Sequence, residues 1–232
     1  MYQVSNLSQS RFPEKDYQEI MDMKLYDLND MVKACCNDCK GCSDCCFGMG
    51  QSILLDPYDI WQLETHLQET FAGLMREKIE LHMEDKLILP NLKMQGKAEC
   101  CGFLSREGRC GIHSFRPGLC RLFPLGRNYG EQGLQYFLLE DACSKERTKI
   151  KVKKWLDIPD GRQYTDFLIK WHDLRKGLQA EIAGREESEP EAIKERNMEL
   201  LYIFYEEQYE PADFYGQFEE RLRRFYEIRT AD

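Results

Sequence analysis

Several features that identify common protein classes are missing from this 232-residue chain. No stretch approaches the roughly 18 apolar residues that a membrane span needs. The first residues (MYQVSNLSQSRFPEKDYQ) have neither the basic start nor the apolar run of a secretory signal. The motifs G-x-G-x-x-G, G-x-x-x-x-G-K-S/T, H-E-x-x-H and G-x-S-x-G, typical of nucleotide-binding proteins, zincins and serine hydrolases, are also absent. We therefore expect a cytoplasmic protein without a membrane segment.

Cysteine, in contrast, is abundant, with 11 residues. The chain is 42% hydrophobic and 12% aromatic, so a core can form without covalent cross-links. A disulfide framework is not expected in a reducing compartment, and an odd number of cysteines cannot all pair within one chain. The cysteines therefore indicate metal ligation.

The cysteines are confined to the first part of the chain, and none follows Cys143. This asymmetry predicts a cysteine-cluster metal-binding domain over 1–158 and a C-terminal helical region over 159–232, packed on the same core. The cysteines outside the motifs described below are Cys35, Cys36 and Cys100.

Apolar spacing predicts mostly helices outside the cysteine segments. The Asp56–Pro57 pair should begin a helix, which Gly73 should interrupt. Many Gly and Pro residues and short apolar runs predict loops and short strands over 88–143. Further helices are expected over 16–34, 164–182, 193–205 and 214–226. The expected fold is α+β and predominantly α, with a small cysteine-rich core of loops and short strands surrounded by helices.

The segment CKGCSDCC, residues 39–46, has the spacing C-x2-C-x2-C-C. A spacing of two residues lets a tight turn direct two thiolates at one ion, as in zinc knuckles and ferredoxins. Adjacent side chains diverge in most backbone conformations. We therefore expect one of Cys45 and Cys46 to serve a different site or a remote partner.

Three linked blocks carry a resemblance to a known family: C-x2-C-x2-C-C, C-x-F-L and G-R-C-x-I-H/Y-x-x-R-P-x-x-C-R-x-F-P. They resemble the CxxCxxCC cysteine-cluster family (YkgJ-type), described as zinc- or iron-chelating, and more distantly the motifs of flagellin lysine N-methylase. The resemblance runs from Cys39 to Cys143. The metal ligands that it implies are Cys39, Cys42, Cys45, Cys46, Cys101, Cys110, Cys120 and Cys143.

These thiolates could hold two zinc ions, an iron–sulfur cluster with a zinc ion, or one cluster with spare thiols. Three regularly spaced cysteines and a remote fourth favour an iron–sulfur cluster, [4Fe–4S], because zinc sites usually come as two C-x2-C pairs. A cluster would suit a redox or methylase-like, protein-modifying role with a protein partner or substrate. Zinc would suit a structural or interaction module. Nothing in 144–232 identifies an S-adenosylmethionine site, so whether the protein is an enzyme stays open.

Residues 101–127 contain five arginines and one acid, although the whole chain has a net charge of −9. Arg116 and Arg121 could offset thiolate charge, clamp carboxylates or helix ends, or bind an anionic substrate group. His113 is expected to pack beside the ligands rather than to bind metal. The basic segment 144–155 predicts a solvated helix face rather than a nucleic-acid site.

Overall fold

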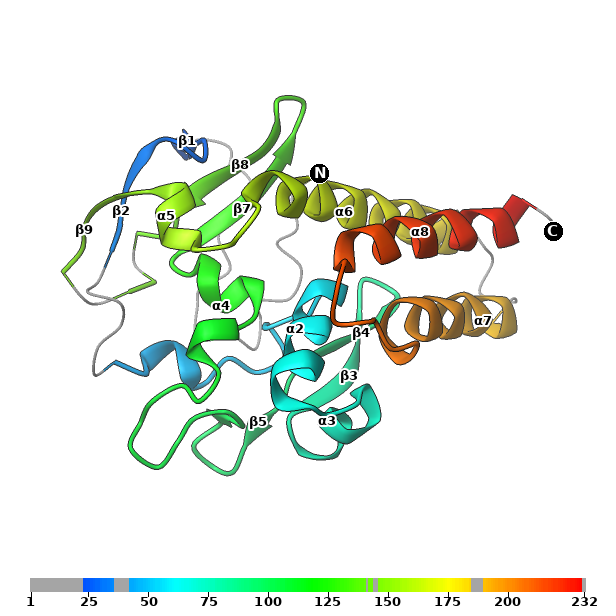
Figure 1. Cartoon of the computed structure of the whole chain (residues 1–232), viewed down its shortest axis with the longest axis horizontal. Helices are drawn as coiled ribbons and strands as arrows, with labels where there is room; N and C mark the ends of the chain where they lie inside the picture. The colour runs from blue at the N-terminus through cyan, green and yellow to red at the C-terminus, as the bar shows by residue number, and fades with distance from the viewer. Residues whose placement is uncertain (1–22, 36–41, 141, 144–145, 185–189, 231–232) are drawn as a thin grey trace. The chain divides into compact units, whose positions relative to one another are not determined.

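The computed structural model describes residues 23–35, 42–140, 142–143, 146–184 and 190–230. Its elements are helices and short antiparallel strands, with helix predominating, so the predicted α+β, predominantly α class is confirmed (Figure 1). Among the described residues, no helix combines the length and apolar character that crossing a membrane would require.

The chain forms two compact units, each made from two separate segments. Unit 1 comprises 1–53 and 93–169, and unit 2 comprises 54–92 and 170–232. Residues 54–92 therefore group with the C-terminal helices, a division that differs from a single boundary after residue 158. The assignment of a metal-binding domain to 1–158 and a helical region to 159–232 stays a prediction.

Unit 1 is built from short elements. Its strands are β1 (Leu25–Tyr26), β2 (Met31–Cys35), β5 (Met94–Gln95), β6 (Cys100–Cys101), β7 (Leu125–Gly130), β8 (Gly133–Leu138) and β9 (Thr148–Lys151). Its helical segments are η3 (Asp44–Cys46), η4 (His113–Phe115), α4 (Gly118–Leu122), α5 (Val152–Leu156) and the start of α6 (Gly161–Gly184). All strand pairs are antiparallel, in the orders β1-β8-β7, β2-β9 and β5-β6.

One hydrophobic cluster holds the ends of these elements together. Its buried members are Val32, Ala34, Leu122, Leu125, Tyr136, Val152, Trp155 and Leu156. The Trp155 indole donates a hydrogen bond of 3.3 Å to the Leu122 carbonyl, which fastens α5 to the end of α4. Since α4 carries Cys120 and Arg121, this cluster positions part of the cysteine-rich region.

The helix expected over 16–34 is wrong for its described part. Leu25 pairs with Phe137 of β8, and Met31 pairs with Lys151 of β9, so this segment is extended. The spacing of Leu28, Met31 and Val32 fits one helical turn, but burial alternates along β2 as a strand requires. Residues 16–22 of that prediction lie outside the described residues.

The predicted basic helix face also differs in its backbone. Lys149 and Lys151 lie on β9, and Lys153 and Lys154 lie on the short helix α5. All four are exposed, as a solvated face requires, while the residues between them, such as Val152, turn inward.

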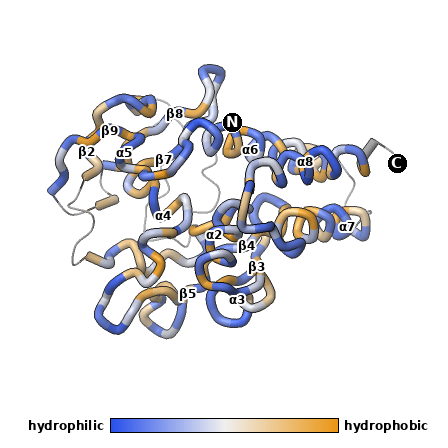
Figure 2. The backbone as a smooth tube through the Cα atoms, viewed as in Figure 1, coloured by the Kyte–Doolittle hydropathy of each residue, from blue (hydrophilic) through white to orange (hydrophobic). Residues whose placement is uncertain are grey.

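Unit 2 contains one hairpin and the long helices. Its elements are α2 (Pro57–Leu67), α3 (Phe71–Glu77), β3 (Ile79–Glu84), β4 (Leu87–Leu92), the rest of α6, α7 (Pro190–Leu201), the π-helical turn η5 (Tyr202–Glu206) and α8 (Phe214–Thr230). The three helices predicted after residue 160 are confirmed. Along them, hydrophobic and hydrophilic residues alternate (Figure 2), and the aromatic stripes form the core around Trp171, Phe204 and Phe218.

The helix that begins at the Asp56–Pro57 pair is confirmed, with a capping box formed by Asp56 and Asp59. The expected interruption at Gly73 is wrong. The first helix ends where Gln68 takes a left-handed conformation (φ 55°), and Thr70 caps α3 by accepting a hydrogen bond of 3.1 Å from the Gly73 amide. Gly73 is thus part of the first turn of α3.

Candidate metal centre

Short backbone contacts bring the first cysteine segment against the second. The turn η3 is closed by a hydrogen bond of 2.8 Å from the Cys46 amide to the Ser43 carbonyl. Immediately afterwards, Phe47 forms an antiparallel bridge with Cys100, and the Gly48 amide donates to the Glu99 carbonyl at 2.9 Å. The thiols of η3 therefore lie near β6, although more than 50 residues separate the two segments in the sequence.

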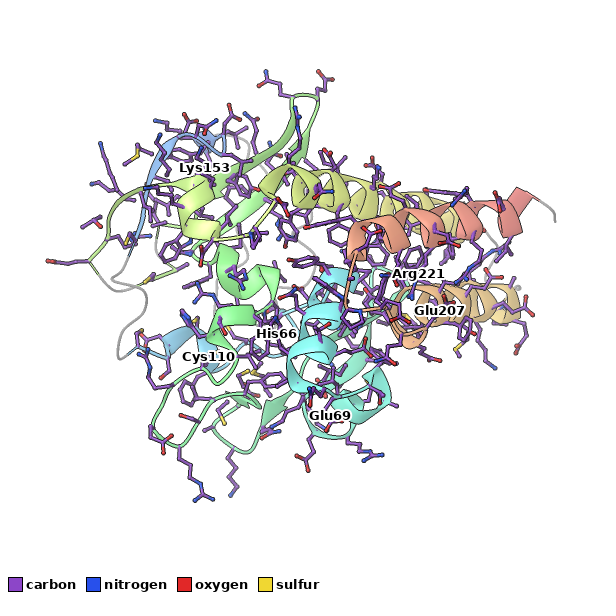
Figure 3. All side chains as sticks on the ribbon, in the orientation of Figure 1. His66, Glu69, Cys110, Lys153, Glu207 and Arg221 are labelled. Atoms are coloured by element: carbon purple, nitrogen blue, oxygen red, sulfur yellow. The ribbon has the colours of Figure 1, made fainter. Side chains whose placement is uncertain are left out.

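A second local fold returns the chain from Cys101 to Cys110. Leu104 bridges Cys110 in antiparallel fashion, and the Gly111 amide donates to the Phe103 carbonyl at 2.9 Å. An added Cβ at Gly111 would lie 3.2 Å from that carbonyl oxygen, so glycine permits the close approach. Figure 3 labels Cys110 in the loop that precedes α4.

The adjacent thiols of Cys45 and Cys46 form a hydrogen bond with each other. This bond, helped by the positive charge of Arg116, lowers the pKa of Cys45 to about 7, while the same bond and burial raise the pKa of Cys46. In the tight turn of η3 the two adjacent thiols therefore lie side by side. The expectation that one of them serves a different site stays a prediction.

The thiols of Cys101 and Cys110 lie within electrostatic reach of this pair. Burial, and then the negative charge of Cys110, raises the pKa of Cys101. Burial also raises the pKa of Cys110, and the negative charge of Cys45 raises it further. We define the cysteine quartet as Cys45, Cys46, Cys101 and Cys110, whose thiols come from three separate stretches of unit 1 and act on one another electrostatically.

The remaining predicted ligands lie outside the cysteine quartet. Cys42 precedes η3, Cys120 lies on α4, and Cys143 lies between β8 and β9, and all three are partly buried. Cys39 lies outside the described residues. Within the described part of the chain, no three His, Cys, Asp or Glu side chains are grouped in a way that could hold a single metal ion. The ligand role of each cysteine stays a prediction.

Two of the cysteines outside the motif have other contacts. Cys35 lies at the end of β2, where it pairs with Thr148. The Cys100 thiol donates a hydrogen bond of 3.6 Å to the Gln95 carbonyl, within the β5–β6 pair. Cys36 lies outside the described residues.

Arg121 clamps backbone carbonyls. Its guanidinium donates to the carbonyls of Arg116 (3.0 Å), Asp157 (3.2 Å) and Ser114 (2.5 Å), and the side chain is buried. Ser114 lies in η4, and Arg116 and Asp157 are the C-cap residues of η4 and α5, so Arg121 clamps helix ends, one of the alternatives that the sequence offered. Arg121 therefore fixes the path of the chain from Ser114 to α4 and ties it to the end of α5.

Arg116 has a different environment. Its Nη1 donates to Nε2 of His113, and its Nε is buried with no hydrogen-bond partner among the described residues. Its positive charge acts on the thiols of both Cys45 and Cys110. Because His113 accepts through Nε2, that nitrogen is directed at Arg116.

The residues present fit a thiophilic metal centre. Thiolates are soft ligands that suit zinc and iron–sulfur clusters, and both carry the negative charge of their ligands. The Nε of Arg116 is a buried donor without an acceptor among the described residues, which an anionic centre would satisfy.

Comparison with known proteins gives one match. No curated protein and no solved structure is significantly similar to the chain. A family model named CxxCxxCC, described as "Putative zinc- or iron-chelating domain", matches residues 38–151. This span contains every predicted ligand and the whole cysteine quartet, and its description supports metal binding. The resemblance to the CxxCxxCC family is therefore confirmed over residues 38–151.

Proposed function

We propose that the chain holds an iron–sulfur cluster through its cysteine thiolates and serves in redox chemistry or protein modification. The observation that carries this proposal is the cysteine quartet, whose Cys45 and Cys110 thiols are stabilised as thiolates by the charge of Arg116. The proposed ligands remain the eight cysteines of the motif, with the quartet as the centre of the set. A protein partner or substrate, rather than nucleic acid, is part of the same proposal.

The sequence spacing of three regularly placed cysteines and a remote fourth favours a cluster over a single zinc ion. Four thiolates at about 2.3 Å from one tetrahedral zinc ion would lie about 3.8 Å from each other. No three described ligands are arranged in this way, although the quartet thiols act on one another electrostatically. Cysteines that bind different iron atoms of one cluster stand farther apart, so a looser set is compatible with a cluster.

The chain's own residues would bind the centre and limit its contact with water. Cys101 is buried, and Ile112, two residues after Cys110, is 2% exposed. A bound cluster would supply one-electron redox chemistry. The arginines would offset its negative charge.

Anaerobic purification followed by visible spectroscopy and by iron, sulfide and zinc analysis tests this proposal. We expect a coloured protein that contains iron and acid-labile sulfide. A colourless protein with stoichiometric zinc and neither iron nor sulfide would overturn the cluster and leave the zinc-stabilised module, which the family description also names.

Matched variants test the ligand assignment in the same preparation. Cys110→Ser should reduce the iron content, because Cys110 belongs to the quartet. Cys35→Ser should leave it unchanged, because Cys35 is outside the motif and pairs with β9. Equal losses in both variants would refute the partition of the cysteines.

A further inference from the structure

Five lysines of unit 1 are exposed on elements that adjoin one another. Strand β2 carries one of them, β9 carries two, and α5, which follows β9 directly, carries two more. The lysine face, as we define it, consists of Lys33, Lys149, Lys151, Lys153 (labelled in Figure 3) and Lys154. Within the part of the chain that the structure describes, no ion pair joins these lysines to an acidic side chain, although the chain has a net charge of −9.

The pairing of β2 with β9 places like charges opposite each other. Val32 pairs with Ile150, and beyond this pair the register shifts by one residue. Lys33 and the buried Ala34 therefore both stand opposite Lys149. Residues that stand opposite each other in an antiparallel pair have Cα atoms about 5 Å apart. Like charges in such positions destabilise the pair, so β2 and β9 hold an unfavourable concentration of positive charge on their exposed side.

Backbone hydrogen bonds fix α5 against the start of β2. The Val152 amide donates to the Asp30 carbonyl at 3.0 Å, and the Lys153 amide donates to the Leu28 carbonyl at 2.9 Å. The inward side chains of these elements, such as Trp155, belong to the buried cluster of unit 1. The backbone beneath the lysine face is therefore ordered, while the ammonium groups remain in water.

The composition of the lysine face favours a protein partner over a nucleic acid. Met31, which pairs with Lys151, is 48% exposed, so a thioether lies among the ammonium groups. Apolar side chains of a protein can cover a flexible Met side chain, whereas phosphates cannot. Trp155, the single aromatic residue of β2, β9 and α5, is buried, so a nucleobase finds no ring on which to stack.

Acidic residues border the lysine face and favour a short partner. Asp27 and Asp30 are exposed in the turn before β2, and Asp157 is exposed at the end of α5. The Asp30 carboxylate accepts a hydrogen bond of 2.8 Å from the Asp27 amide, which holds it in this turn. A nucleic-acid duplex or an anionic bilayer extends beyond the lysines and would be repelled by these acids. A short acidic segment can bind between them.

We propose that the lysine face binds an extended acidic segment of a partner protein. Lys149 and Lys151 are two residues apart on β9, so their Cα atoms are about 7 Å apart. An extended segment with an acidic residue at every second position presents carboxylates with the same repeat. Those carboxylates offset the repulsion between Lys33 and Lys149. This inference rests on the protein partner of the proposed function, and it does not depend on which metal is bound.

The test measures, by fluorescence anisotropy, how a labelled peptide of alternating glutamate and serine binds to the full chain purified with its metal. The face variant Lys33→Gln/Lys149→Gln removes two charges from the lysine face. The control Lys86→Gln/Lys97→Gln removes two exposed charges from the turns after β3 and β5. We expect the face variant to bind the peptide about tenfold more weakly than the parent protein, and the control to match the parent. Equal losses in both variants would overturn the proposal.

Two other polyanions test the class of partner. A DNA duplex and vesicles that contain phosphatidylserine are titrated against the same proteins, at equal concentrations of anionic groups and at the same salt concentration. We expect both to bind more weakly than the peptide. Tighter binding of either one, lost in the face variant, would assign the lysine face to that polyanion and overturn the acidic segment.

Urea unfolding tests the register on which the proposal depends. Lys33 and Lys149 repel each other because they stand opposite, so Lys33→Gln should raise the urea concentration at the midpoint of unfolding. Lys97→Gln should leave this midpoint unchanged. An unchanged or lower midpoint in Lys33→Gln would contradict the register and overturn the proposal.

The two proposals fail in different ways. Zinc in place of iron overturns the cluster, while the loss of peptide binding in the face variant still supports the acidic segment. A protein with a cluster that does not bind the peptide overturns the acidic segment alone. The metal content of the face variant should equal that of the parent protein in either case.

Discussion

Glu64 is a buried carboxylate of unit 2, at the junction of α2 and α3. Its Oε1 accepts a hydrogen bond of 2.7 Å from the Phe71 amide, while Oε2 is buried without a partner among the described residues. Burial raises the pKa of Glu64 to about 7, against the opposing effects of this hydrogen bond and of Arg221. The carboxyl group is therefore mostly protonated below neutral pH.

This raised pKa predicts a loss of stability with increasing pH. The folded-state pKa of Glu64 exceeds its unfolded value of 4.5. Its favourable contribution to the free energy of unfolding is therefore complete below about pH 4.5 and is lost as the pH rises to about 7. Relative to Glu64→Gln, the parent protein should lose about 1–3 kcal/mol of unfolding free energy between pH 5 and pH 8. Urea unfolding at both pH values measures this difference.

The exposed Glu69 provides the control, because Glu69→Gln should leave the pH dependence unchanged. If the parent protein and Glu64→Gln show the same pH dependence, the buried carboxyl group does not titrate as described.

The sequence predicted the type of chemistry at single residues better than their individual contacts. The C-x2-C-x2-C-C spacing is a local property, so it pointed to thiolate ligation directly. Arg116 and Arg121 belong to the same motif and have the same charge, yet Arg116 donates to the His113 imidazole whereas Arg121 holds backbone carbonyls. That difference depends on where Ser114 and Asp157 lie in three dimensions, which spacing does not encode.

At the scale of elements, the β7–β8 hairpin depends on a close contact at Gly126. The ring of Phe137, its partner on β8, lies so close that a Cβ added at Gly126 would be 2.2 Å from a ring carbon. Gly126→Ala should lower the unfolding free energy by about 1–3 kcal/mol, because the ring cannot be displaced without disturbing the strand pair. Denaturant unfolding at constant pH provides the measurement.

Gly177 is the matched glycine, exposed in α6 with open space around its Cα. Gly177→Ala should raise the unfolding free energy by about 0.5–1 kcal/mol, since alanine favours helix. Opposite signs for the two substitutions are the expected result. A stabilised Gly126→Ala would show that Phe137 does not pack as described.

Prediction from sequence succeeded for elements whose pattern is long and failed where a pattern is short. The apolar stripe that begins at Tyr164 continues through Ile182, so only a helix fits. In contrast, 25–35 offers a few apolar residues that fit either a helical turn or a strand. Pairing with β8 and β9, which follow more than 100 residues later, decides the outcome.

At the scale of the whole molecule, the cysteines and the aromatic core belong to different units. All the described cysteines lie in unit 1, whereas the packing of Trp171, Phe204 and Phe218 lies in unit 2. The sequence did not predict that 54–92 joins the C-terminal helices, because this grouping depends on contacts between distant segments. One such contact is the hydrogen bond of 2.6 Å from the Ile88 amide to the Asn197 side chain.

This division predicts an uneven response to metal removal. In unit 1 the cysteine segments are joined by short bridges and few buried residues, so bound metal should supply much of their order. Removing the metal with a chelator should raise the rate of backbone amide hydrogen exchange in both segments. The factor of increase should be at least ten times larger in 93–143 than in 190–228. An equal increase in both segments would indicate one cooperative unit in which the metal acts on the whole chain.

The central claim is that the motif cysteines bind metal as a set, and two adjacent residues test it most directly. Cys101 belongs to the quartet and is buried, whereas Cys100 lies outside the motif and bonds to Gln95. The measurement is metal content per chain in Cys101→Ser and Cys100→Ser, purified anaerobically beside the parent protein. We predict that Cys101→Ser loses most of its metal and that Cys100→Ser keeps the parent content. Full metal content in Cys101→Ser, or the same loss in both variants, would contradict the account.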